Sequence, residues 1–174
     1  MKKTFILFSA LTLSIAFTSC GTKETKQDIE APAGMVALDL SKYGKQFSVF
    51  VPDTNAAKLE ITEQSWGALE VKVGKYFHIS ITEDPGDMEL RKSDIKSNDI
   101  NVFKSFVVDE PASIMWESQI TKPEFHFYSI QKNGANTYVF EDVVPADGES
   151  FSKDAIQKMF ESAKTIIEKK KPEA

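Results

Sequence analysis

Two neighbouring runs of alternating apolar and polar residues constrain the fold more than any other feature of this chain. In residues 69–73 and again in residues 77–81, every second side chain is Leu, Val, Phe or Ile, and polar or charged residues fill most of the positions between. This alternation is typical of half-buried antiparallel strands. Gly74-Lys75 lies between the runs and suits a turn, so the sequence predicts a β-hairpin.

A second hairpin is predicted from Phe125–Lys132 and Asn136–Val144. These runs flank Asn133-Gly134, a dipeptide that readily supplies the positive φ of a tight turn. Both runs contain large aromatic residues, which favour strands. The pattern therefore indicates two antiparallel strands joined by a short turn.

Three shorter apolar runs are also predicted to be strands. They are Phe47–Val51, which ends at Pro52, and the pair Phe103–Val108 and Ile114–Trp116, which Pro111 separates. The charged segment Asp87–Asn98 is compatible with a short helix or with an irregular excursion.

After residue 150 the apolar period changes from two to about 3.6, which predicts an amphipathic helix over Ser152–Ile167. Ser152 suits the N-cap, and the apolar stripe would cover the sheet. The predicted fold class is therefore α+β, with an antiparallel sheet of about six strands packed against a long C-terminal helix. The stripe consists of Ile156, Met159, Phe160, Ala163 and Ile167.

This order of strands closed by a helix resembles the PsbP/Mog1-like group, most visibly in Phe47–Pro52 and in Ser152–Ile167. The resemblance implies an α/β sandwich over most of residues 35–170. Members of that group are mostly accessory or binding proteins without catalytic centres. The resemblance carries over no site residue.

Residues 1–19 have the three zones of a signal peptide. Lys2 and Lys3 are followed by the apolar run Phe5–Phe17 and then by Thr18-Ser19-Cys20. The apolar run is shorter than the roughly 20 residues that span a bilayer. The sequence therefore predicts a cleaved leader.

The end of the leader resembles the lipobox of bacterial lipoproteins, although Phe17 replaces the usual Leu. The resemblance implies that Cys20 becomes lipidated and anchors the chain to a membrane. Gly21 after the cysteine favours the outer membrane, facing the periplasm. The alternative is a plain secretory leader cut near Ser19, which would leave Cys20, the single cysteine, as a free thiol.

The remaining sequence divides into a polar tether at residues 20–34 and one globular domain at residues 35–170. The whole chain has a net charge of −5. Losing Lys2 and Lys3 from the 21 basic residues leaves 19 against 26 acidic ones, a net charge of about −7. Such a charge disfavours nucleic-acid binding. The expected partners are the bilayer, through acylated Cys20, and an envelope protein.

Candidate catalytic and metal-binding residues are few. His78 and His126 are the only histidines, and each is predicted to be exposed on the less apolar face of its strand, so neither a metal site nor a catalytic triad is expected. The carboxylates around Pro85-Gly86 resemble a calcium loop only loosely and favour a hydrated turn. No cofactor is expected.

The strongest candidate binding feature is aromatic. Tyr128, Tyr138 and Phe140 lie on the second hairpin, which has large residues on both faces, so one face is a possible binding surface. Alternatively, the C-terminal helix or the Asp87–Asn98 segment covers that face.

Together these features favour a membrane-anchored, non-enzymatic accessory or binding module of the cell envelope. The alternative is a small envelope hydrolase whose site is assembled from distant residues. A pocket that holds His78 or His126 beside a carboxylate would favour the enzyme, and a flat aromatic patch would favour the binding module.

Overall fold

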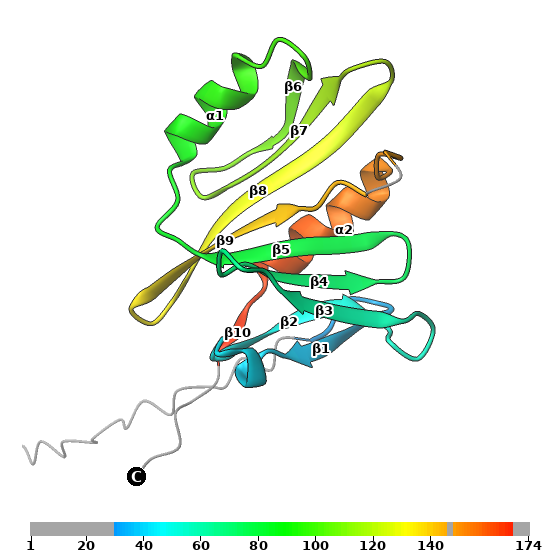
Figure 1. Cartoon of the computed structure of the whole chain (residues 1–174), viewed down its shortest axis with the longest axis vertical. Helices are drawn as coiled ribbons and strands as arrows, with labels where there is room; N and C mark the ends of the chain where they lie inside the picture. Colours follow the sequence, from blue (N-terminus) through cyan, green and yellow to red (C-terminus); the bar gives the residue numbers. More distant parts are fainter. Residues whose placement is uncertain (1–29, 146–147, 169–174) are drawn as a thin grey trace, which may run out of the picture.

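The computed structural model describes residues 30–145 and 148–168, which form two antiparallel sheets and two α-helices (Figure 1). The predicted signal peptide, Cys20 and most of the predicted tether lie outside the described residues. The predicted α+β class with mostly antiparallel strands is confirmed.

The larger sheet has seven strands in the order β3-β4-β5-β9-β8-β7-β6, and every neighbouring pair is antiparallel. This is one strand more than the six that the sequence predicts. The seven strands are β3 (Leu59–Glu63), β4 (Leu69–Val73), β5 (Phe77–Glu83), β6 (Val102–Asp109), β7 (Ser113–Gln119), β8 (Pro123–Asn133) and β9 (Asn136–Asp142).

Both predicted hairpins are present. β4 pairs with β5 from Leu69↔Ile81 to Val73↔Phe77, and β8 pairs with β9 as far as Asn133↔Asn136. The second turn is therefore centred on Gly134-Ala135, one residue later than predicted. Gly134 has a φ of 60° and no other residue type has a positive φ among the described residues, a combination typical of a type II′ turn.

A smaller sheet of three strands closes one end of the domain. It consists of β1 (Met35–Asp39), β2 (Phe47–Pro52) and β10 (Ile167–Glu168), with the 3₁₀ turn η1 (Ser41–Tyr43) between the first two. The strand order is β1-β2-β10. Because β2 is the central strand, its first five residues are all buried.

The C-terminal helix is α2 (Lys153–Lys164), and Ser152 caps it as predicted by accepting a hydrogen bond from the Ala155 N–H at 3.2 Å. The prediction of a long helix reaching Ile167 is wrong. Thr165, Ile166 and Ile167 are all β-branched, which lowers their helix propensity. Ile167 instead pairs with Ser48, so the chain leaves the helix to extend the small sheet.

The two helices lie on opposite faces of the large sheet (Figure 1). Phe127 packs in the main core with α2, whereas the next residue, Tyr128, packs in a second apolar cluster with α1 (Met88–Lys96). This alternation is what the pleat of a strand requires. Hence the sheet has an α2 face, which holds the main core, and an α1 face, which α1 covers only in part.

The three aromatic residues of the proposed binding surface are buried, so the prediction that they form an exposed patch is wrong. Tyr138 and Phe140 lie in the main core, and Tyr128 lies beneath α1. Phe47 of the small sheet packs against Tyr138 with ring centroids 4.9 Å apart. The alternative prediction, that the Asp87–Asn98 segment covers one face of the hairpin, is correct for Tyr128, which packs against α1.

Candidate functional site

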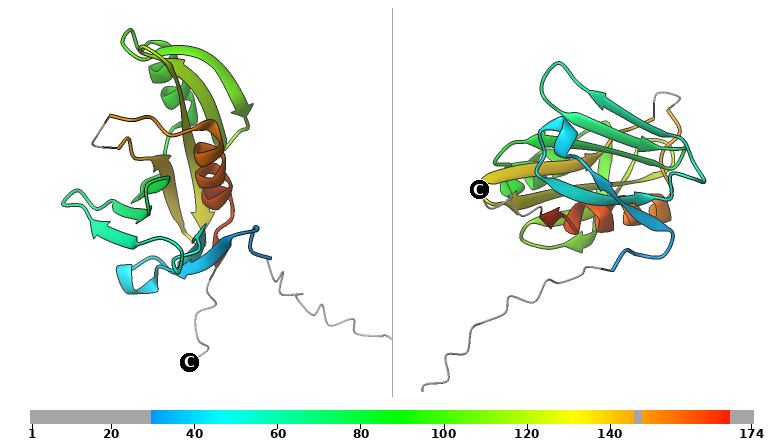
Figure 2. Two further views of the ribbon diagram at one scale, coloured as in Figure 1. Left: turned by 90° about the vertical axis from the view of Figure 1, so that its right-hand side faces the viewer. Right: turned by 90° about the horizontal axis from the view of Figure 1, so that it is seen from below.

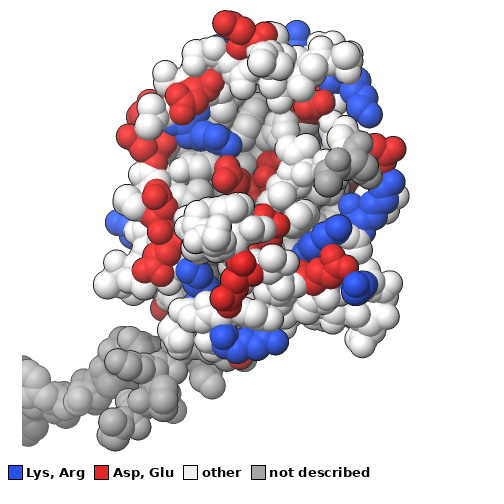
Figure 3. Space-filling model, in the orientation of Figure 1, with Lys and Arg blue, Asp and Glu red and all other residues white. Residues whose placement is uncertain are grey.

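The α1 face of the sheet is hollowed beside α1, and acidic side chains lie in the hollow (Figure 3). One cavity here has a volume of about 920 Å³ and lies between the β4–β5 hairpin and the segments on either side of residues 146–147. Ligand sites commonly have volumes of roughly 300–1,000 Å³. Its lining includes Glu70, Lys72, Tyr76, His78, Val143, Val144 and Phe151.

His78 and Glu70 form a pair in the wall of this cavity. His78 Nε2 lies 3.1 Å from a carboxylate oxygen of Glu70, and the His78 side chain is only 17% exposed. The prediction that His78 is exposed is therefore wrong, although it does lie on the polar face of β5. Burial lowers the pKa of His78, because desolvation outweighs the favourable hydrogen bond and charge of Glu70.

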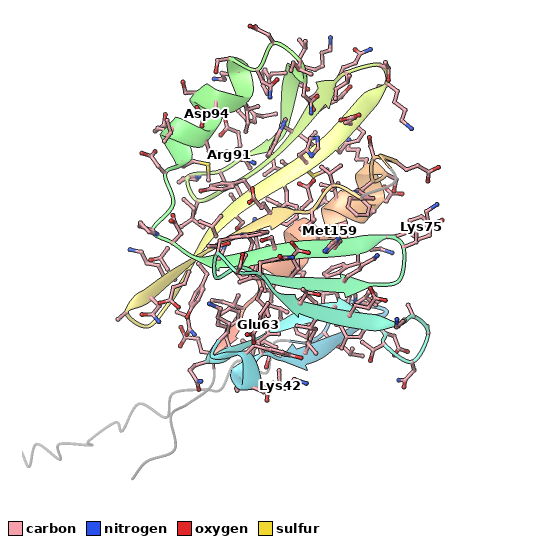
Figure 4. The ribbon with its side chains drawn as sticks, in the orientation of Figure 1. Lys42, Glu63, Lys75, Arg91, Asp94 and Met159 are labelled. Carbon is pink, nitrogen blue, oxygen red and sulfur yellow. The ribbon has the colours of Figure 1, made fainter. Side chains whose placement is uncertain are left out.

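One ion pair connects the two sides of the same cavity. Lys75, in the β4–β5 turn, lies 2.9 Å from a carboxylate oxygen of Glu149 (Figure 4 labels Lys75). The ring of Tyr76, the next residue, is 69% exposed. The cavity thus combines an exposed aromatic ring with charged groups, a mixture suited to binding a polar ligand.

A second, smaller cavity of about 250 Å³ lies between α1 and the sheet. His126 lines it together with Asp142, Asn101, Trp116 and Arg91. The His126 side chain is 13% exposed, so the prediction that it is exposed is also wrong. His126 is covered by α1 and by the connection that follows α1, which includes Asn101.

Asp142 holds the imidazole of His126 in one orientation. Its Oδ2 lies 2.8 Å from His126 Nδ1, and its Oδ1 accepts a hydrogen bond from the Phe127 N–H at 2.9 Å. The register between β8 and β9 ends at Tyr128↔Glu141, and Phe127 is the residue just before Tyr128. The Asp142 carboxylate therefore accepts the hydrogen bond of the first backbone N–H beyond this register. Because a carboxylate accepts, Nδ1 carries the proton, and in neutral His126 the lone pair is on Nε2.

The other imidazole nitrogen lies among polar groups of the second cavity. His126 Nε2 is 3.4 Å from Asn101 Nδ2 and 3.8 Å from a carboxylate oxygen of Glu124. Burial by itself would lower the pKa of His126, but the hydrogen bond and charge of Asp142, assisted by Glu124, outweigh burial and raise it.

Arg91, labelled in Figure 4, lies on α1 and lines the second cavity together with His126. Its Nη2 lies 3.1 Å from a carboxylate oxygen of Glu141, and its guanidinium lies 5.6 Å from the Trp116 ring centroid and 5.2 Å from that of Tyr128. Burial raises the pKa of Glu141, while the charge of Arg91 opposes this increase. The guanidinium therefore links the charged and aromatic groups under α1.

These cavities are neighbours on the α1 face. Val144 lines both the first and the second cavity, and Arg91 and Asp94 line both the second cavity and a third one of about 580 Å³. We call the three together the groove. The groove exists because α1 and the segments near Val144 cover only parts of the sheet.

Two of the carboxylates around Pro85-Gly86 accept hydrogen bonds from nearby backbone N–H groups. Asp84 accepts a hydrogen bond from the Gly86 N–H at 2.7 Å, and Asp87 caps α1 by accepting one from the Leu90 N–H at 2.9 Å. Gly86 has a φ of 65°, and a Cβ there would lie 2.8 Å from Ile130. In residues 30–145 and 148–168, no three His, Cys, Asp or Glu side chains are arranged to hold a metal.

The two histidines are expected to titrate on opposite sides of the ordinary histidine pKa of about 6.5, with the pKa of His78 below it and that of His126 above it. Proton NMR can measure this directly, because the chain contains only two histidines. His78→Gln removes one signal and assigns both. Two signals with the same midpoint would contradict the opposite environments.

No family model, curated protein or solved structure matches this chain. Neither helix in the part of the chain that the structure describes has the length and apolar character needed to cross a membrane. Sequence reasoning identified His78 and His126 but missed Asp142, Asn101 and Arg91. These three are contributed by separate elements, and no spacing in the sequence relates them to His126.

Proposed function

We propose that this chain is a lipid-anchored protein of the cell envelope whose domain binds an envelope component in the groove without catalysing a reaction. The observation that carries the proposal is the cavity of about 920 Å³ at one end of the groove, which has the size and mixed lining of a ligand site. The ligand would be held in the hollow of the α1 face, since the predicted aromatic patch is buried.

The position of the chain ends supports a tethered arrangement. The first described residues lead into β1, and β10 ends the described chain in the same small sheet (Figure 2). An acylated Cys20 followed by a flexible tether of about 14 residues would hold this end roughly 20 Å from the membrane. The groove lies on the α1 face of the other sheet and would then stay open to soluble components. We propose that the domain faces the periplasm, so these would be components of the periplasm.

The resemblance to the PsbP/Mog1-like group also supports a binding role. The sheet with a covering helix agrees with that outline in its coarse features, and we propose an α/β sandwich of this type for the domain. Because members of the group are mostly accessory or binding proteins, the likeness favours a partner or ligand over a substrate.

The anchor is tested by metabolic labelling. Radiolabelled palmitate is expected to enter the wild-type chain and to be absent from the Cys20→Ser variant, which should also leave the membrane fraction, because two or three acyl chains provide the stable attachment. If the variant remained equally membrane-bound without label, the proposed lipid anchor would be wrong.

The ligand site is tested with Tyr76→Ala. A library of small polar compounds titrated calorimetrically into the detergent-solubilised full chain is expected to yield binders whose Kd rises about tenfold or more in this variant, since burying such a ring contributes roughly 1.5–3 kcal/mol. Trp66→Ala is the matched control, because Trp66 is also 69% exposed but does not line the groove. Equal losses in both variants would argue against a site at this cavity.

The alternative, a small envelope hydrolase, is favoured by two histidine–carboxylate pairs that each line a cavity, His78–Glu70 and His126–Asp142. However, no hydroxyl group is among the hydrogen-bond partners of His126 that the structure describes, which are Asp142 and Asn101. Turnover of an ester panel by the wild-type chain that disappears in His126→Ala would replace the binding proposal with this one.

A further inference from the structure

Two side chains that line the second cavity carry buried polar atoms without a partner, one a donor and one an acceptor. Three buried side-chain atoms lack one among the described residues, and two of these belong to side chains that line this cavity. Arg91 Nε is a donor, and Asn101 Oδ1 is an acceptor. A buried polar group without a partner costs roughly 1–3 kcal/mol, so a ligand that satisfied both atoms would gain free energy.

His126 adds a group of either hydrogen-bonding kind to this cavity. Its Nε2 lies 3.4 Å from the Asn101 amide nitrogen and 3.8 Å from a carboxylate oxygen of Glu124, and it can accept a hydrogen bond from a ligand when the ring is neutral and donate one when the ring is protonated. A movement of Asn101 and Arg91 that uncovers Oδ1 and Nε would bring one donor, one acceptor and this imidazole together.

The charges around the cavity select against ionic ligands. Asp94 and Asp142 line it and Glu141 lies beside it, so a ligand carboxylate or phosphate would meet several like charges. A ligand ammonium would meet the guanidinium of Arg91, and it has no acceptor capacity for the Arg91 Nε–H. The remaining chemistry is a neutral group that both donates and accepts, and a hydroxyl does this through a single oxygen, whereas an amide needs two separate atoms.

We infer that the groove binds a neutral saccharide, with one sugar ring in the second cavity. Vicinal hydroxyls can donate to Asn101 Oδ1, accept from Arg91 Nε and bond to His126 Nε2 in either protonation state. The volume of about 250 Å³ is large enough for one sugar ring. This inference rests on the proposed function, since it names the chemical class of the ligand in the same groove.

The first cavity extends the match to a longer saccharide. Val144 lines both this cavity and the second one, so the two are neighbours. The exposed ring of Tyr76 offers a flat apolar surface on which the C–H face of a further sugar can pack. The two cavities would thus hold successive sugar units of one chain.

The test titrates uncharged trisaccharides and, in a separate arm, blocked uncharged tripeptides into the detergent-solubilised full chain. Trisaccharides are expected to bind, and Asn101→Ala is expected to weaken this binding about three- to tenfold, as the loss of one or two neutral hydrogen bonds predicts. Asn101→Ala keeps the backbone N–H that bonds to Asn98 Oδ1 at 2.8 Å, so the local turn is preserved. His126→Gln is a second variant, and Trp66→Ala is the control.

The outcomes separate this inference from the proposed function. Binding of trisaccharides that both cavity variants weaken and the control does not would support it. Binding of tripeptides or of ionic compounds in the groove, with no saccharide binding, would overturn the ligand class and leave the binding function standing. Absence of any ligand that depends on Tyr76 would overturn both.

Discussion

Replacing Phe140 with alanine is expected to lower the free energy of unfolding by about 3–5 kcal/mol. Phe140 is fully buried in the main core, on the central strand β9, and its ring centroid lies 6.2 Å from that of Phe47. The substitution removes most of an aromatic side chain from a place where the large sheet, the small sheet and α2 meet, so neighbouring groups cannot close the space without moving several elements.

Denaturant unfolding followed by circular dichroism measures this loss. The control is Tyr76→Ala, whose ring is exposed and whose stability should change by about 0.5 kcal/mol or less. If Phe140→Ala lowered the free energy of unfolding as little as the control, the ring would not belong to the core. Phe140 would then again be a candidate residue of the binding surface.

The contrast between these two rings shows what alternation in a sequence can predict. The period of two correctly indicated the hairpins and which residues share a face of the sheet, because that period is a property of the strand itself. It did not indicate what covers each face. Tyr128 and Tyr138 lie on opposite faces. Helix α1 packs over Tyr128 and Phe47 of the small sheet packs over Tyr138, which depends on packing between elements far apart in the chain.

The end of α2 shows a second limit. Ile167 fits the apolar stripe of a helix, and the stripe predicted a helix that continues to it. In the structure, Ile167 instead pairs with Ser48 in β2, a strand more than 100 residues earlier in the sequence. A local pattern could not include that partner, although the run of β-branched residues after Lys164 was a local signal against further helix.

The candidate site was the least predictable part. His126 was recognised as chemically interesting, but its environment comes from the end of β9, from α1 and from the chain after α1. Asp142 follows an ordinary strand pattern, and Asn101 lies in a polar connection, so neither stands out in the sequence. Their importance depends on distances that only the fold determines.

Asp142→Ala is expected to be as destabilising as the core substitution, with a loss of about 3–5 kcal/mol, because it removes one partner of a largely buried pair. The Asp142 side chain is 4% exposed, and its loss leaves both His126 Nδ1 and the Phe127 N–H without an acceptor. Asp142→Asn is the matched control, since its amide oxygen can still accept one of these two hydrogen bonds and it should lose less.

The pH dependence of this loss distinguishes the ion pair from simple packing. The pKa of His126 is raised in the folded state, so the stability linked to it is fully present below the unfolded pKa of about 6.5 and is lost as the pH rises through the folded pKa. Asp142→Ala removes the group that raises this pKa. The difference from wild type should therefore be larger near about pH 5.5 than near about pH 8.5, and the NMR midpoint of His126 should fall. A loss of equal size at both pH values, with an unchanged midpoint, would show that Asp142 acts only through the Phe127 backbone.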